Sequence, residues 1–108
     1  MDLVNITQEM YETSQRLDQA SRVIHKMARV KAETERVYRM KLAQEMMTLK
    51  AEGMSVTLIA DIARGNVSDL KFERDLAEGQ YKAAIESMEA IKSRLSALQS
   101  ILRYQEER

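Results

Sequence analysis

Four basic side chains in the first half of the chain have the charge and spacing to contact phosphates or an acidic protein surface. They recur at intervals of four, three and seven residues, which places them on one face of a helix: Arg22, Lys26, Arg29 and Arg36. The segment from residue 22 to residue 41 holds seven basic residues against two glutamates, a net charge of plus five. It contains no tryptophan or phenylalanine, so the aromatic platform expected of a single-strand nucleic-acid binder is missing. This face is interpreted either as a phosphate or acidic-partner contact or as a solvated charged surface.

A second candidate is apolar and lies near the middle of the chain, where two glycines bracket a short segment. The residues of this corner that could contact a partner are Val56, Leu58, Ile59, Ile62 and Arg64. The order of short helix, glycine and longer helix partly matches a DNA-binding helix-turn-helix. Residues 69 to 78, however, carry four acidic residues against two basic ones, a net charge of minus two where DNA phosphates would approach. The corner is therefore interpreted either as a closure of the helical hairpin or as a docking surface for a protein.

Catalysis is not expected from this sequence. His25 is the only histidine and the chain has no cysteine, so neither a histidine–cysteine metal site nor a nucleophile paired with a histidine base can be assembled. No glycine-rich phosphate loop or nucleophile-elbow motif occurs. We expect no catalytic, metal-binding or cofactor-binding residue, no cofactor and no small-molecule substrate.

Two long helices are expected to position these candidates. Apolar residues in both halves of the chain recur at alternating steps of three and four, which is typical of a heptad seam. The residues that we expect to form an oligomer seam are Ile6, Met10, Leu17, Ile24, Met27, Met88, Ile91, Leu95, Leu98 and Leu102. The charged residues Lys31 and Arg74 interrupt the pattern, one in each half.

Serine and glycine positions suggest where the helices begin and end. Gly53 and Gly65 are predicted stops, and Ser55 and Ser68 are predicted N-caps. We therefore predict helices over about residues 5–51, 55–64 and 68–106 within a single domain, residues 1–108. The fold class is all-α: an antiparallel helical hairpin of two long helices joined by a short corner helix.

The last helix is expected to need neighbours on two sides. A second stripe of apolar or small residues lies roughly opposite its heptad seam: Phe72, Leu76, Gly79, Ala83, Ala90, Ala97 and Ile101. Because two crossed helices enclose no interior, we expect a homo-oligomer, dimeric or higher, that forms a helical bundle or coiled coil. The alternative interpretation of the stripe is that its alanines are only good helix formers at solvent positions.

The overall composition favours a soluble, cytoplasmic, helical protein. Charged residues make up 31% of the 108 residues and cancel to a net charge of zero, and proline is absent. The longest apolar runs fall far short of a bilayer span, and the first residues lack the basic and then apolar blocks of a secretion signal. We expect a cytoplasmic location and no membrane partner.

Residues 32 to 101 resemble a known group of proteins in the order of their segments. A lysine-rich helix ends in "LKAEG", an apolar corner follows, and an acidic start leads into a heptad helix containing "YKAAIESMEAIKSRL". This order is similar to that of small uncharacterised all-helical proteins encoded by tailed bacteriophages and prophages of Gram-positive bacteria. The resemblance implies a phage or prophage origin, an all-helical fold and a location in the host cytoplasm, and it assigns no site residue.

The function expected from these observations is that of a non-enzymatic helical assembly or adaptor protein. It would self-associate through its seams and present its corner or basic face to a host or phage protein. The first alternative is an accessory nucleic-acid-binding protein that uses the basic face, for which salt-sensitive DNA binding would be the sign. The second is a purely structural oligomer.

Overall fold

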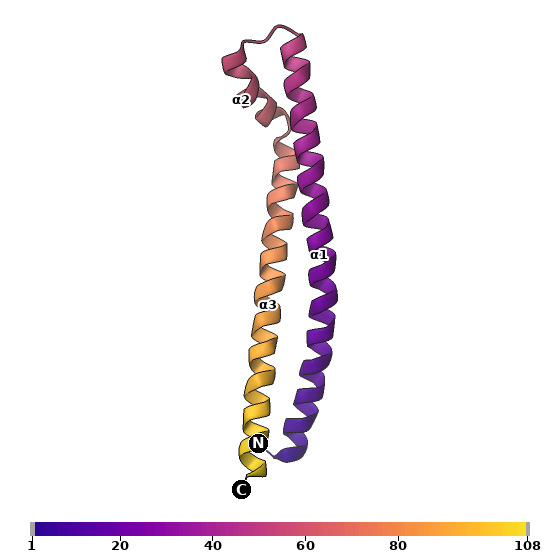
Figure 1. The fold of residues 1–108 in the computed structure, drawn as a ribbon, viewed down its shortest axis with the longest axis vertical. Coiled ribbons are helices and arrows are strands. Elements are labelled where there is room, and N and C mark those ends of the chain that lie inside the picture. Colours follow the sequence, from indigo (N-terminus) through magenta and orange to yellow (C-terminus); the bar gives the residue numbers. More distant parts are fainter. Residues whose placement is uncertain (1, 108) are drawn as a thin grey trace. The chain divides into compact units, whose positions relative to one another are not determined.

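The computed structural model describes residues 2–107, and helices are the regular secondary structure found there. In chain order the helices are α1 (Leu3–Ala51), α2 (Val56–Asn66) and α3 (Ser68–Glu106), as Figure 1 shows. The prediction of an all-α fold is confirmed, and the long helices α1 and α3 pack against each other as in a helical hairpin. None of the helices in the described part is long and apolar enough to cross a membrane.

Polar groups fix the beginning of α1, and a glycine fixes its end. The Asp2 carboxylate accepts a hydrogen bond from the backbone N–H of Asn5 at 2.8 Å, which satisfies a donor that the first helical turn leaves open. At the other end Gly53 has a φ of 83°, in the left-handed region that favours glycine. The N–H groups of Gly53 and Met54 donate to the carbonyls of Lys50 and Leu49. The predicted stop at Gly53 is therefore present.

The second predicted stop, at Gly65, is wrong. Gly65 lies inside α2, which continues to Asn66, and only Val67 separates α2 from α3. The Val67 carbonyl accepts hydrogen bonds from the N–H groups of Leu70 and Lys71, so Val67 occupies the N-cap position of α3. Val67 is also buried, so its packing holds the junction where the sequence indicated a glycine turn. There is no separate turn at Gly65 of the kind that a helix-turn-helix uses.

Both serine side chains depart from the predicted capping role. Ser55 stands at the N-cap position of α2, but its hydroxyl makes no capping bond and lies 3.0 Å from the Thr57 hydroxyl. Its backbone carbonyl accepts from the N–H groups of Leu58 and Ile59. Ser68 is the first residue of α3, one position later than the cap. Asp69 lies in the first turn, where its charge complements the helix dipole.

The chain forms two compact units. The first contains the chain up to Lys26 and again from Lys82, which is the early part of α1 and the later part of α3. Ile6 and Leu98 are buried in it at 0% and 1% exposure, and the polar residue Thr13 is buried as well. Arg94 of α3 forms an ion pair with Glu9 of α1.

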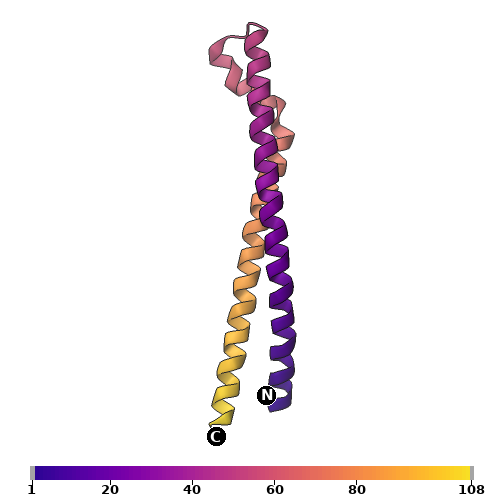
Figure 2. The same cartoon turned by 45° about the vertical axis from the view of Figure 1, so that its right-hand side comes forward.

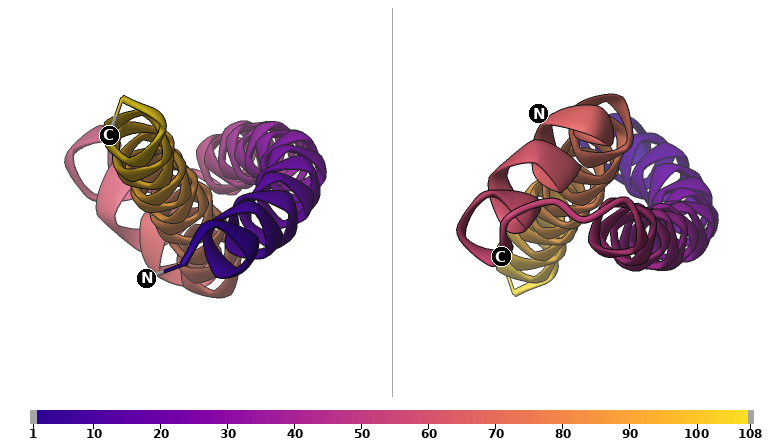
Figure 3. Two further views of the ribbon diagram at one scale, coloured as in Figure 1. Left: turned by 90° about the horizontal axis from the view of Figure 1, so that it is seen from below. Right: turned by 90° about the horizontal axis from the view of Figure 1, so that it is seen from above.

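The second unit extends from Met27 to Tyr81 and holds the end of α1, all of α2 and the start of α3. Its buried apolar residues come from all three elements and from the junction: Tyr38, Leu49, Ala63, Val67 and Ala77. The Asn66 side-chain amide donates to the Glu45 carboxylate at 2.7 Å, which ties the end of α2 to α1. Figures 2 and 3 show how the chain leaves α1 and returns through α2 to α3.

Candidate functional site

The corner helix α2 leaves apolar side chains in solvent. Val56 is 82% exposed and Leu58 is 50% exposed. Ala63, about two turns after Val56, is fully buried and anchors the C-terminal half of α2, while Ile59 and Ile62 are half-buried. Arg64 is exposed and lies 3.6 Å from the Asp61 carboxylate, a weak surface pair. The corner residues predicted from sequence therefore lie together on one short helix, and part of their apolar surface is uncovered.

The four predicted phosphate contacts are all exposed, but they are not equivalent. In the first unit Arg22 and Lys26 make no ion pair with any described residue. In the second unit Arg29 is likewise unpaired, whereas Arg36 donates two hydrogen bonds to the Glu33 carboxylate at 2.6 and 3.2 Å. This contact raises the pKa of Arg36 and lowers that of Glu33. The carboxylate thus largely neutralises one of the four cations.

The seam residues predicted from sequence are buried or half-buried within a single copy of the chain. Ile6, Met10, Leu17 and Ile24 of α1 and Met88, Ile91, Leu95, Leu98 and Leu102 of α3 are buried or half-buried in the first unit. Met27 is half-buried at the start of the second. The second stripe on α3 has the opposite environment, since all seven of its residues are exposed. A further helix would therefore pack on exposed surface such as this α3 stripe, because the seam residues are already covered within the chain.

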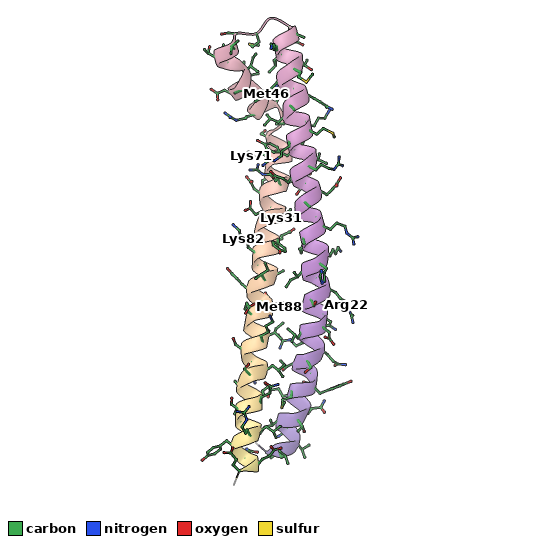
Figure 4. The ribbon with its side chains drawn as sticks, viewed as in Figure 1. Arg22, Lys31, Met46, Lys71, Lys82 and Met88 are labelled. Atoms are coloured by element: carbon green, nitrogen blue, oxygen red, sulfur yellow. The ribbon has the colours of Figure 1, made fainter. Side chains whose placement is uncertain are left out.

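The two charged residues that interrupt the seam are held by tyrosines. In the second unit the Lys31 ammonium lies 5.7 Å from the centre of the Tyr81 ring, and the Arg74 guanidinium lies 4.6 Å from that of Tyr38. Figure 4 shows Lys31 on the side of α1 that faces α3. Arg74 also lies 3.4 Å from the Glu35 carboxylate and 2.9 Å from that of Asp75. Each cation in this polar layer is thus compensated by the opposite helix.

An open hollow of about 620 Å³ lies beside this polar layer. Its lining residues are Lys31, Ala32, Glu35, Arg36, Arg74 and Glu78. Hydrogen bonding by Arg39, with smaller contributions from Arg74 and Lys31, lowers the pKa of Glu35. Because its cations already have carboxylate or tyrosine partners, the hollow offers little free charge to a ligand. Sequence reasoning missed this layer, although each interrupting cation stands seven residues before a tyrosine, the only local sign of it.

The residues with catalytic or metal-binding potential are dispersed. His25 is exposed on α1. Among residues 2–107, no group of three or more histidine, aspartate or glutamate side chains is arranged to hold a metal ion. Within the same range, every buried side-chain nitrogen or oxygen has a hydrogen-bond partner. The candidate sites that the structure offers are two kinds of surface: the apolar corner on α2 and the exposed sides of the long helices.

Comparison with known proteins does not extend these assignments. No protein-family model, no curated protein and no solved structure matches this chain.

Proposed function

We propose that this protein is a non-enzymatic helical adaptor, of bacteriophage or prophage origin, that binds a host or phage protein through the α2 corner. The exposed apolar surface of α2 is the observation that supports the proposal. Val56 and Leu58 are 82% and 50% exposed on a helix whose only charged side chains, Asp61 and Arg64, lie near each other. Leu58 shares one face of α2 with Ile59 and Ile62, and large apolar side chains grouped in this way on a surface are typical of protein-binding sites.

The local structure of the corner favours binding over simple closure. Burial of Ala63 and Val67, with the bond from Asn66 to Glu45, already anchors α2 against α1. Leu58 and Ile62 are four residues apart, so they lie on one helical face and form the i, i+4 anchor pair that helix-in-groove recognition uses. An apolar groove on a partner would cover this pair.

A nuclease-treated affinity pull-down from a Gram-positive bacterial lysate tests this proposal. The bait is the full chain, compared with a Leu58→Asp, Ile62→Asp variant. A matched control carries Val4→Asp and Thr7→Asp, which place the same charges on exposed α1 positions of the first unit. We expect a discrete partner in stoichiometric amount with wild type and the control, and its loss with the corner variant. Recovery of only the chain itself, or equal recovery with both variants, would contradict the proposal.

A nucleic-acid-binding function is the second candidate, and it is supported by the lack of ion-pair partners for Arg22, Lys26 and Arg29 within residues 2–107. Phosphate binding by these cations would weaken steeply with salt, because it depends on counterion release. The test is duplex DNA binding at several salt concentrations by wild type and by an Arg22→Glu, Lys26→Glu variant. A salt-dependent affinity that the variant loses would support this candidate. Absence of DNA binding at low salt would exclude it.

A further inference from the structure

The second unit has two outer faces, one on α1 and one on α3, that lie opposite the packed seam. At roughly 100° per residue, Met40 and Met47 lie about 200° and 180° around α1 from the buried Tyr38. Phe72 and Leu76 lie about 160° and 200° around α3 from the seam residue Arg74. Since Arg74 and Tyr38 face each other, the two outer faces point in roughly opposite directions.

Both outer faces expose large apolar side chains. Met40 and Met47 are 46% and 71% exposed on α1, and Phe72 and Leu76 are 67% and 49% exposed on α3. On each helix the two side chains are separated by about one or two turns, four residues on α3 and seven on α1, so they lie along one side of that helix and form an apolar ridge. Such ridges can pack against each other as helices do in bundles.

The charges beside the two ridges are opposite in sign. Residues 39 to 51 of α1 carry three basic residues against one glutamate, a net charge of plus two. Residues 68 to 78 of α3 carry four acidic residues against two basic ones, a net charge of minus two. Lys41 and Lys50 on α1 and Asp69 and Glu73 on α3 are exposed and have no ion-pair partner within residues 2–107. They remain available for pairing between molecules.

We infer that the α1 outer face of one copy of this chain binds the α3 outer face of a second copy. Both faces carry an apolar ridge, and the net charges beside the two ridges are opposite in sign. One copy of the chain can therefore bind a second copy through these faces. Because the two faces differ and point apart, the contact is heterologous, so each copy retains one free face of each kind for the next copy. This self-association goes beyond the proposed adaptor function and uses none of the α2 residues to which the partner is assigned.

Mixing two variants, each with one damaged face, tests the inference by sedimentation velocity. The first variant carries Met40→Asp and Met47→Asp, and the second carries Phe72→Lys and Leu76→Lys; all four positions are exposed, so both should keep wild-type helicity by circular dichroism. Wild type should increase in mass with concentration in the micromolar range. Each variant alone should remain at the 12.5 kDa of one chain. An equal mixture should form a capped complex of twice that mass.

The outcomes separate this contact from other kinds of association. A monomeric wild type would overturn the inference, and so would a variant that still associates with itself, because that would indicate contact between like faces. A mixture that stays monomeric would also overturn it. As a charge control, Asp18→Lys with Glu86→Lys should leave the mass unchanged, whereas Asp69→Lys with Glu73→Lys should weaken association roughly tenfold. Loss of self-association with the pull-down partner retained would leave the adaptor proposal standing.

Discussion

The guanidinium of Arg74 on α3 lies 4.6 Å from the centre of the Tyr38 ring on α1. In a second contact the two helices exchange roles: the Lys31 ammonium on α1 lies 5.7 Å from the centre of the Tyr81 ring on α3. Each tyrosine stands seven residues after the cation on its own helix, so the two contacts are related as in a symmetric antiparallel pair. The charges that interrupt the apolar seam thereby become a layer that holds α1 and α3 in one register.

The Arg74–Tyr38 contact should therefore contribute measurably to stability. In a double-mutant cycle with Arg74→Met and Tyr38→Leu, we expect a coupling of about 1 kcal/mol, in the range of cation–π pairs that are partly shielded from water. Urea unfolding followed by circular dichroism gives the four stabilities. Arg64→Met replaces Arg74→Met in the control cycle and should show no coupling to Tyr38. Equal coupling in both cycles would show that the ring does not recognise Arg74.

The core of the first unit should be sensitive to loss of volume at Ile6. Ile6 is fully buried, whereas Val4 on the same helix is 75% exposed. We expect Ile6→Ala to reduce the free energy of unfolding by about 2–4 kcal/mol and Val4→Ala to change it by less than about 0.5 kcal/mol. Urea unfolding measures both. Similar small effects would mean that the pairing of α1 with α3 around Ile6 does not form in solution.

Two glycines should respond in opposite directions to the same substitution. Gly53 has a φ of 83°, so a Cβ there is strained even though no atom lies within 4 Å of it. Gly65 is helical and equally open, so Gly65→Ala only improves helix propensity. We expect Gly53→Ala to lower the free energy of unfolding by about 1 kcal/mol and Gly65→Ala to raise it by roughly 0.5–1 kcal/mol. A stabilising Gly53→Ala would contradict the turn geometry.

Acid should weaken the second unit through its carboxylates. Hydrogen bonds from Arg36 and Arg39 lower the pKa values of Glu33 and Glu35, and those from Lys71 and then Arg74 lower the pKa of Asp75. Because the folded pKa lies below the unfolded one, the stabilisation is complete above the ordinary carboxylate pKa and is lost as the pH falls through the lowered value. We expect Tm to fall below roughly pH 4.

Asp75→Asn provides the comparison for this pH dependence. The variant cannot lose a charge at position 75, so its Tm should fall less steeply with acid than that of wild type. The exposed pairs are screened by salt, so high ionic strength should also reduce the difference between the two curves. Parallel curves for wild type and variant would show that Asp75 does not contribute.

The sequence was sufficient to predict the helices and their buried faces, because burial along one helix follows its own periodicity. Ile6 and Leu98, both predicted seam residues, are among the most buried side chains. The polar layer could not be predicted, because the contact of Arg74 with Tyr38 depends on the register between two helices, which neither helix alone determines. Gly65 was misinterpreted because burial of Ala63 and Val67 outweighs the weak tendency of glycine to end a helix.

Photo-cross-linking from the corner in Gram-positive bacterial cells would test the adaptor function most directly. A benzophenone amino acid replaces Leu58 in the full chain and, as a control, the exposed Glu12 in the first unit. We expect one discrete adduct from position 58, heavier than the chain by the mass of a different protein, and its absence from position 12. Adducts only with further copies of the chain, or the same adducts from both positions, would contradict the assignment of α2 as the partner-binding surface.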